Sequence, residues 1–232
     1  MLKKCFVAIV ALMVALFTTS VKGECYGTRG ANEPLYNADK VVLAYAEFYA
    51  YGSTDYATEA GFSQSVINEQ LNYLANKFKK NFQDFCLSDA TLNRVTDIYL
   101  NKLRNSMDIS TKLKVGDAEH PVITLKANVL DDESFEKQAV NDKNLQALVF
   151  ANLGLKEKGK TCADLKADPQ YQAAAVEAIT NFINDLDFGS TKTIDITCKK
   201  VTGDMITGAD VNSVYWAPRD PADVLRFIEN GR

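Results

Sequence analysis

The sequence predicts an α+β fold in which helices pack on antiparallel strands. Residues 66–85 place apolar side chains at steps of four and three, which is typical of one buried stripe on a helix. Residues 123–129 instead alternate apolar and polar side chains, which is typical of a half-buried strand. Because this order of helices followed by strands occurs twice, we expect helices segregated from an antiparallel sheet.

The first half of the chain contains two expected helices and a hairpin. The helices cover residues 66–85 and 91–106, each with an apolar stripe. Residues 112–115 form the first strand, and residues 123–129 form the second after a turn that contains glycine and proline. In the second strand, Ile123, Leu125 and Ala127 are expected to face the core.

The second half repeats this order. Residues 144–155 are helical in pattern, and Asp168 followed by Pro169 is typical of an N-cap and a first helical position. Gly189 is expected to end that helix as its C′ residue. Strands follow near residues 194–198 and 211–216. A last helix is expected after Asp220 and Pro221, before Gly231.

We expect one domain over residues 24–232, and an internal duplication into halves 38–130 and 131–232 is an alternative description. The segment C-L-S-D begins at Cys86, and C-A-D-L begins at Cys162. Each precedes a helix that leads into the tripeptide S-T-K and then a strand. Chance likeness between two helix–strand units is the competing explanation.

Residues 1–23 have the pattern of a signal peptide. Lys3 and Lys4 precede residues 6–17, an uncharged apolar run of twelve. A bilayer span needs about 20 apolar residues, so the run is too short for an anchor and suits a signal-peptide core. A buried N-terminal helix is the alternative. We therefore expect an exported protein, located in the periplasm, at the cell surface or outside the cell, with no membrane span after cleavage.

The predicted cleavage site precedes Glu24. Val21 and Gly23 supply the small residues at the −3 and −1 positions. Lipid attachment needs a small residue directly before the modified cysteine, whereas Glu24 precedes Cys25. We therefore expect cleavage without lipidation.

The four cysteines that remain after cleavage predict two disulfides, because an even number in an exported chain is typical of a disulfide framework. The pairing expected from the two halves is Cys25–Cys86 and Cys162–Cys198. The spacing contains no C-x-x-C, which disfavours a zinc site.

Charge excludes one class of partner. The chain carries 26 Lys and Arg against 30 Asp and Glu, a net charge of −4. Without the three lysines of the signal peptide, 23 basic residues face 30 acidic ones, which gives −7. An acidic surface repels phosphate backbones, so we expect no nucleic-acid partner.

Catalytic and cofactor motifs are missing from the sequence. The single histidine, His120, precedes a proline in an expected loop and has no nucleophile motif near it. Ser134 and Lys137 match S-x-x-K, but no S-D-N or K-T-G accompanies them. Asp185 and Asp187 lack the other ligands of a calcium loop. We expect no cofactor, no metal and no catalytic residue, with a secreted hydrolase that uses carboxylates as the alternative.

Aromatic residues supply the candidate binding site. The side chains expected to line a groove are Tyr45, Tyr49, Tyr51, Tyr215 and Trp216. Tyrosine and tryptophan combine a large apolar face with a polar tip, which suits ligand clefts and protein interfaces. Packing of the same rings in the core is the alternative interpretation.

Residues 46–63, with the sequence A-E-F-Y-A-Y-G-S-T-D-Y-A-T-E-A-G-F-S, resemble the opening of certain uncharacterised bacterial secreted proteins and lipoproteins. Tyr215 and Trp216, followed by Asp220 and Pro221, are similar too. The resemblance implies helices with strands in a duplicated or NTF2-like domain, and an extracytoplasmic binding or envelope role. It supplies no catalytic residue.

Together these patterns predict an exported, disulfide-bonded, non-enzymatic protein that binds a small ligand or another envelope protein. A third hypothesis is self-association through the aromatic clusters. The ligand, the partner and the oligomeric state stay open at this point.

Overall fold

The structure is a computed structural model that describes residues 37–52, 56–57, 60–202 and 214–231. Its helices are α2 (Ala38–Tyr51), α3 (Gln64–Lys80), α4 (Asp89–Ser106), α5 (Asp132–Asn141), α6 (Lys143–Glu157), α7 (Cys162–Ala167), α8 (Pro169–Asp185) and α9 (Pro221–Asn230), with a 3-10 turn at Gln83–Phe85. Its strands are β1 (Ser110–Val115), β2 (Val122–Asn128), β3 (Thr191–Thr202) and β4 (Val214–Pro218).

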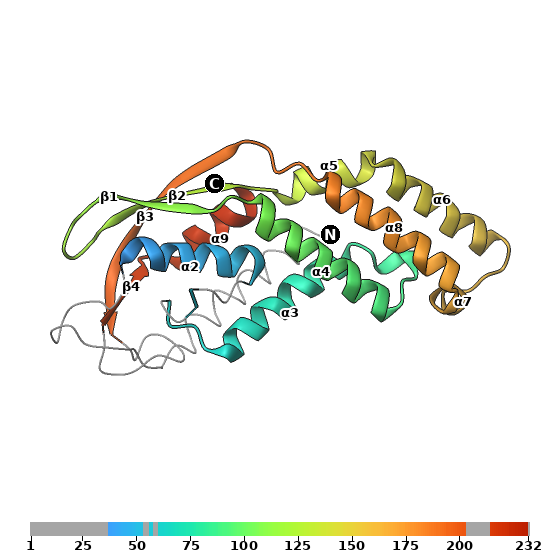
Figure 1. Ribbon diagram of the computed structural model, residues 1–232, viewed down its shortest axis with the longest axis horizontal. Coiled ribbons are helices and arrows are strands. Elements are labelled where there is room, and N and C mark those ends of the chain that lie inside the picture. The colour runs from blue at the N-terminus through green and yellow to red at the C-terminus, as the bar shows by residue number, and fades with distance from the viewer. Residues whose placement is uncertain (1–36, 53–55, 58–59, 203–213, 232) are drawn as a thin grey trace.

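The strands form one antiparallel sheet in the order β1-β2-β3-β4, and the α+β prediction is confirmed. Ile123 pairs with Ile196, and Leu125 pairs with Ile194, so their side chains share one face. Helices α2 and α9 pack on the sheet and cover the face that carries them (Figure 1). The predicted alternation in β2 is confirmed, because Ile123, Leu125 and Ala127 are buried.

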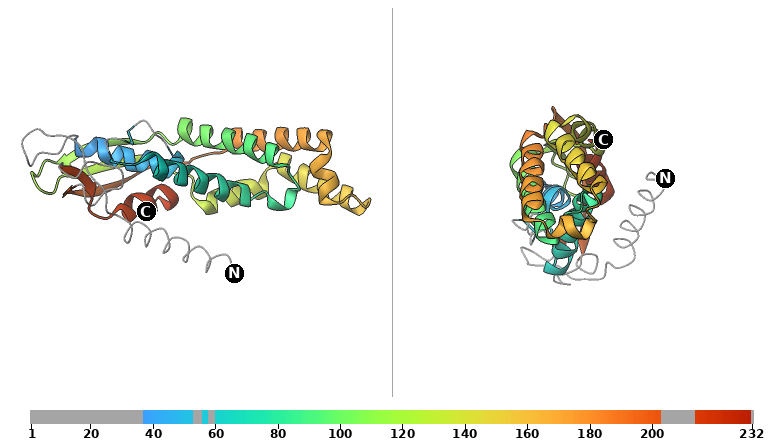
Figure 2. Two further views of the ribbon diagram at one scale, coloured as in Figure 1. Left: turned by 90° about the horizontal axis from the view of Figure 1, so that it is seen from below. Right: turned by 90° about the vertical axis from the view of Figure 1, so that its right-hand side faces the viewer.

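The molecule is elongated, with the sheet at one end and a bundle of helices at the other (Figures 1 and 2). Helix α8 packs against α4 on one side and α6 on the other, with the short α7 at the far tip. Helices α3 and α5 lie between the two ends. We call the β1–β4, α2 and α9 region the sheet end, and the α4, α6, α7 and α8 region the helical end.

Side-chain caps fix where most helices begin. Asp168, which directly precedes Pro169, is the N-cap of α8 as predicted, and its side chain accepts hydrogen bonds from backbone N–H groups in the first turn of α8. Asp220 caps α9 in the same way. Thr161 and Asp164 form a reciprocal capping box at α7. Gly231 ends α9 in the left-handed region at φ 65°, which also agrees with the sequence.

Two predicted boundaries are wrong. The helix expected over residues 66–85 ends at Lys80, because the chain turns into the 3-10 segment and then into a left-handed residue, Cys86, at φ 53°. Gly189 does have a positive φ of 65°, but α8 ends earlier and Leu186 is its C-cap. Residues 211–213 of the expected last strand lie outside the described residues.

The disulfide in the structure differs from the expected pairs Cys25–Cys86 and Cys162–Cys198. Cys86 is bonded to Cys162, with their Cα atoms 5.1 Å apart. The bridge joins the two halves because α4 and α8 lie side by side, which brings the segments that precede them together. Cys198 is buried in the sheet and has no disulfide partner among the described residues, and Cys25 lies outside them.

A buried polar cluster lies beside this bridge. Tyr171 on α8 donates to the carbonyl of Phe85 at 2.5 Å, and the amide of Asn152 on α6 donates to the Tyr171 hydroxyl at 2.9 Å. Asn152 is only 4% exposed, so the bond to Tyr171 satisfies an amide N–H that burial removes from water. These hydrogen bonds fix α6 and α8 against the turn that contains Cys86.

The expected signal peptide, residues 1–23, and its cleavage site lie outside the described residues. Within the part of the chain that the structure describes, no helix has the length and apolar character needed to cross a bilayer.

Candidate functional site

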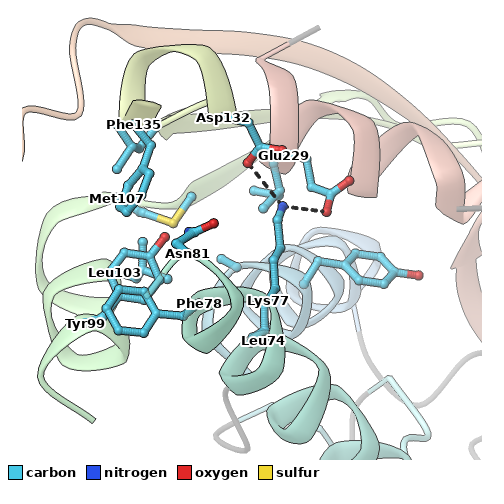
Figure 3. A pocket seen from close by; sticks show the side chains of 14 residues that line it. Leu74, Lys77, Phe78, Asn81, Tyr99, Leu103, Met107, Asp132, Phe135 and Glu229 are labelled. Carbon is cyan, nitrogen blue, oxygen red and sulfur yellow. Dashed lines mark hydrogen bonds and ion pairs between the residues drawn. The ribbon is translucent and has the colours of Figure 1, made fainter. Parts of the chain in front are cut away.

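A small cavity lies where the sheet end meets the helical end. Its volume is about 80 Å³, and helices α2, α3, α4, α5 and α9 contribute its walls. The side chains that line it in Figure 3 include Leu74, Lys77, Phe78, Asn81, Tyr99, Leu103, Met107, Asp132, Phe135 and Glu229. We call this space the junction cavity.

Aromatic rings form one wall of the junction cavity. Phe78 of α3 stacks on Tyr99 of α4, with ring centroids 4.3 Å apart and planes at 16°. Phe135 of α5 meets Tyr99 edge-on at 6.0 Å. Stacked and edge-on rings of this kind hold one another in place and present π-faces or edges to a neighbouring group. The wall is therefore rigid and largely apolar (Figure 3).

An ion-paired cluster forms the opposite wall. The Lys77 ammonium lies 3.2 Å from Asp132 Oδ1 and 3.3 Å from Glu229 Oε1, so one cation serves two carboxylates. The Lys77 and Glu229 side chains are 30% and 12% exposed, and Asp132 is 48% exposed. The cluster is thus partly open to solvent, and its formal charge is −1.

The cluster changes the pKa values of its neighbours. Burial by itself would lower the pKa of Lys77, but the carboxylates of Glu229 and Asp132 outweigh that effect and raise it. Burial also raises the pKa of Tyr99 to about 12. Tyr73, next to Glu229, has its pKa raised by burial and then by that carboxylate. Lys77 is therefore protonated at neutral pH, and both phenols are neutral.

This arrangement suits binding better than acid–base or nucleophilic chemistry. A lysine that acts as a nucleophile or base needs a lowered pKa, and the pKa of Lys77 is raised instead. Both carboxylates of the cavity are ion-paired to the same ammonium. Among the described residues, no group of three or more His, Cys, Asp or Glu side chains could hold a metal ion.

The predicted aromatic site is placed mainly in the core. Tyr45, Tyr49, Tyr51 and Tyr215 are each 7% exposed or less, so they do not line an open groove. Trp216 is partly exposed and lies near the Lys200 ammonium, 5.7 Å from the ring centroid. Tyr49 alone of the five lines the junction cavity. Packing in the core, the alternative interpretation, is what the structure shows for the four tyrosines.

The other residues singled out by motif lie apart from this cavity. His120 is exposed in the β1–β2 loop, where its backbone N–H donates to Asp117. Ser134 and Lys137 line a separate groove of about 480 Å³ beside α5. Ser134 donates its backbone N–H to the Asp131 side chain, which caps the start of α5.

Sequence reasoning missed the charged members of the junction cavity. Lys77 lies on a helix whose apolar stripe the sequence predicts, whereas Asp132 lies on α5, which the sequence analysis does not predict, and their ion pair joins positions 55 residues apart in sequence. Glu229 is 152 residues from Lys77. Lys77 is one of three lysines in the last turn of α3, so its sequence position does not distinguish it or indicate its partners.

Comparison of the chain with protein families, with curated proteins and with solved structures found no match.

Proposed function

We propose that this is an exported, disulfide-bonded binding protein, not an enzyme, and that its junction cavity binds the ammonium group of a small organic amine. The observation that carries the proposal is the convergence of two carboxylates on one ammonium inside a cavity with an aromatic wall. The cluster keeps one negative charge that is not balanced within it. A cation with a short apolar tail matches both the charge and the opposite wall.

Export is supported by the pattern of residues 1–23 and by the Cys86–Cys162 bridge, since disulfides persist in oxidising compartments. The resemblance of residues 46–63 to secreted bacterial proteins remains a prediction in the same direction. A secreted hydrolase is less favoured, because the two carboxylates of the cavity are already paired with Lys77.

The volume limits the size of the ligand. An engineered cavity of about 150 Å³ holds one benzene molecule, so about 80 Å³ admits the end of a ligand and not a large molecule. We therefore choose n-propylammonium as the probe. With so few atoms, its dissociation constant should be on the order of 1 mM.

The test is a titration followed by ¹H–¹⁵N NMR. Propylammonium should shift resonances of residues around the cavity, whereas propionate, which has the opposite charge, should not. Glu229→Gln removes a carboxylate from the cavity and should weaken binding roughly tenfold. Glu133→Gln makes the same change at an exposed position on α5 and should leave the affinity unchanged.

A third variant tests the role of Lys77. Lys77→Met removes the internal cation, so the two carboxylates should then bind propylammonium more tightly than in the wild type. Equal response to propylammonium and propionate, or equal weakening by Glu133→Gln and Glu229→Gln, would contradict the proposal.

A further inference from the structure

Helix α6 leaves an apolar face uncovered. Six large hydrophobic side chains are exposed among the described residues, and four of them lie on α5 and α6. These four are Val140 at 71% exposed, Val149 at 39%, Phe150 at 72% and Leu153 at 52%. A contiguous patch of this kind on a folded protein marks an interaction surface.

The pattern of α6 explains why this face exists. Leu145 and Leu148 are buried on the side that packs against α8. Residues 149, 150 and 153 lie on the other side at helical spacing, so α6 is apolar on two faces. Beside the exposed face, a groove of about 350 Å³ is lined by Val140, Val149 and Phe150, together with Phe82 and Phe85 below them.

The charges at the two ends of this face are arranged symmetrically. Lys143 lies seven residues before Phe150, and Glu157 lies seven residues after it. Seven residues make almost two full turns, so all three side chains project from nearly the same side of α6. Lys143 and Glu157 are exposed, and neither has an ion-pair partner within the described ranges.

We propose that the exposed face of α6 is an interface between two copies of this chain, whose α6 helices pack antiparallel about a two-fold axis at Phe150. In that arrangement Lys143 of each copy lies opposite Glu157 of the other, so the ion pair forms twice. A parallel pairing would set like charges against each other. The charge pattern of α6 therefore complements its own reversed copy.

The sizes of the side chains follow the same symmetry. Leu153 lies three residues after Phe150, and Ala147 lies three residues before it, so the two face each other in the antiparallel pair. Val149 and Ala151, one residue before and one after Phe150, pair in the same way. At these two levels of the antiparallel pair, a large side chain of one copy meets a small side chain of the other. This allows the two helices to interdigitate around the paired Phe150 rings.

The surface is limited to α6 and the end of α5. Stable interfaces bury roughly 1,200–2,000 Å² in total, and one helix pair supplies less. We therefore expect a dimer with a dissociation constant in the micromolar range. This proposal is independent of the ligand proposed for the junction cavity.

Sedimentation velocity of the mature, exported protein across the micromolar range tests the proposal, with the N-terminus first established by mass. The wild type should change from monomer to dimer with rising concentration. Phe150→Asp should weaken dimerisation more than tenfold, because it places two carboxylates at the axis. Leu113→Asp also replaces an exposed apolar side chain by a carboxylate, on the edge strand β1 at the sheet end, and should leave dimerisation unchanged.

Charge reversal tests the antiparallel register. Lys143→Glu and Glu157→Lys should each weaken the dimer by roughly three- to tenfold, and the double variant should restore the wild-type affinity. Each substitution also matches the helix dipole, so α6 should remain folded. Lys126→Glu on β2 is the matched control for the change in net charge.

Three outcomes would overturn the proposal. The first is a monomer at every concentration, and the second is a dimer that Phe150→Asp does not weaken. The third is a double charge-reversal variant that does not recover. Binding of the monomer to anionic lipid vesicles that Phe150→Asp abolishes, without any dimer in solution, would assign the face to a membrane surface instead.

Discussion

The two ends of the molecule differ in how completely they bury their helices. At the sheet end, ten of the fourteen residues of α2 are buried between the sheet and neighbouring helices. At the helical end, only three of the fifteen residues of α6 are buried, although α6 is also rich in apolar side chains. Helix α2 is therefore held by the core on most of its surface, whereas α6 is held by a narrow contact with α8 and by the Asn152–Tyr171 hydrogen bond.

Because of this difference, we expect the sheet end to contribute mainly to stability, and α6 and the junction cavity mainly to binding. Among the described residues of the sheet end, the exposed large apolar side chains are Leu113 and Val115 on its edge strand β1. The helical end exposes α6, and the cavity with the partly open charges lies where the two ends meet. Substitutions in the sheet end should therefore reduce stability, and substitutions on α6 or around Lys77 should change binding.

The largest expected effect comes from a matched pair of phenylalanines. Phe48→Ala removes a ring that is 1% exposed at the sheet end and should lower the free energy of unfolding by about 4 kcal/mol. Phe150→Ala removes a ring that is 72% exposed and should change it by less than about 0.5 kcal/mol. Urea denaturation of dilute protein measures both. Similar losses for the two variants would contradict the comparison.

Removal of the bridge should weaken the helical end. The double variant Cys86→Ala/Cys162→Ala opens a loop of sequence separation 76 and should lower the free energy of unfolding by roughly 3–4 kcal/mol. Hydrogen exchange should show that α6, α7 and α8 lose protection before α2 does. Loss of protection in α2 first would mean that the bridge supports the whole molecule and not one end.

Alkaline pH should destabilise the native state through its buried tyrosines, of which Tyr45 and Tyr49 lie at the sheet end and Tyr99 on α4. Burial raises the pKa of Tyr45 and of Tyr49 on α2 above the usual value near 10. Above about pH 10 the unfolded chain therefore loses phenolic protons that the native chain keeps. Stability should fall by about 1.4 kcal/mol per pH unit for each of these tyrosines.

The raised pKa of Lys77 acts in the same direction, because the stability that it contributes is lost once the unfolded lysine deprotonates above about pH 10.4. Urea midpoints measured from about pH 8 to about pH 11 give the change in the free energy of unfolding with pH. Tyr45→Phe should reduce that slope by the contribution of one tyrosine, about 1.4 kcal/mol per pH unit. A flat profile over this range would show that the tyrosines are not protected from ionisation.

A smaller effect is expected at the junction. Lys77→Met leaves Asp132 and Glu229 without their shared cation and should cost about 1–2 kcal/mol, a value reduced because Asp132 is half exposed. Lys80→Met, on an exposed position of the same helix, should change stability by less than about 0.5 kcal/mol. Equal melting temperatures for the two variants would mean that the ion pairs do not link α3 to α5 and α9.

The smallest expected effect concerns whether Cys198 carries a free thiol. Burial raises the pKa of its thiol to about 12, so a native thiol there should resist alkylation near pH 8 and react after unfolding. Alkylation with iodoacetamide, followed by peptide mapping without reduction, measures this. Failure to label Cys198 even in the unfolded chain would show that it is already in a disulfide.

Much of the fold could be predicted because the patterns are local. The alternation in β2 and the Asp-Pro starts of α8 and α9 depend on neighbouring residues alone. Helix α2 was not anticipated, because a helix that is apolar almost all round has no stripe to detect. The internal duplication stays a hypothesis, although α4 and α8, the helices that it would relate, do pack together.

The site could be predicted less well, because it depends on long-range contacts. The tyrosines of α2 have the composition of a binding groove, but the depth at which the sheet buries α2 cannot be read from α2 alone. The Cys86–Cys162 pairing likewise follows from the packing of α4 on α8, which no spacing of cysteines encodes.

The most direct test of the proposed function is the intact mass of protein recovered from the compartment to which its host exports it, first denatured and then native. We predict a denatured mass that begins at Glu24 and rises by two hydrogens for each bridge on reduction, with the Cys86–Cys162 bridge among them. Measured with n-propylammonium added at millimolar concentration, the native protein should carry one bound amine, which Glu229→Gln reduces and Glu133→Gln does not. A denatured mass that still includes residues 1–23, or a native protein whose bound mass is an anion, would contradict the account.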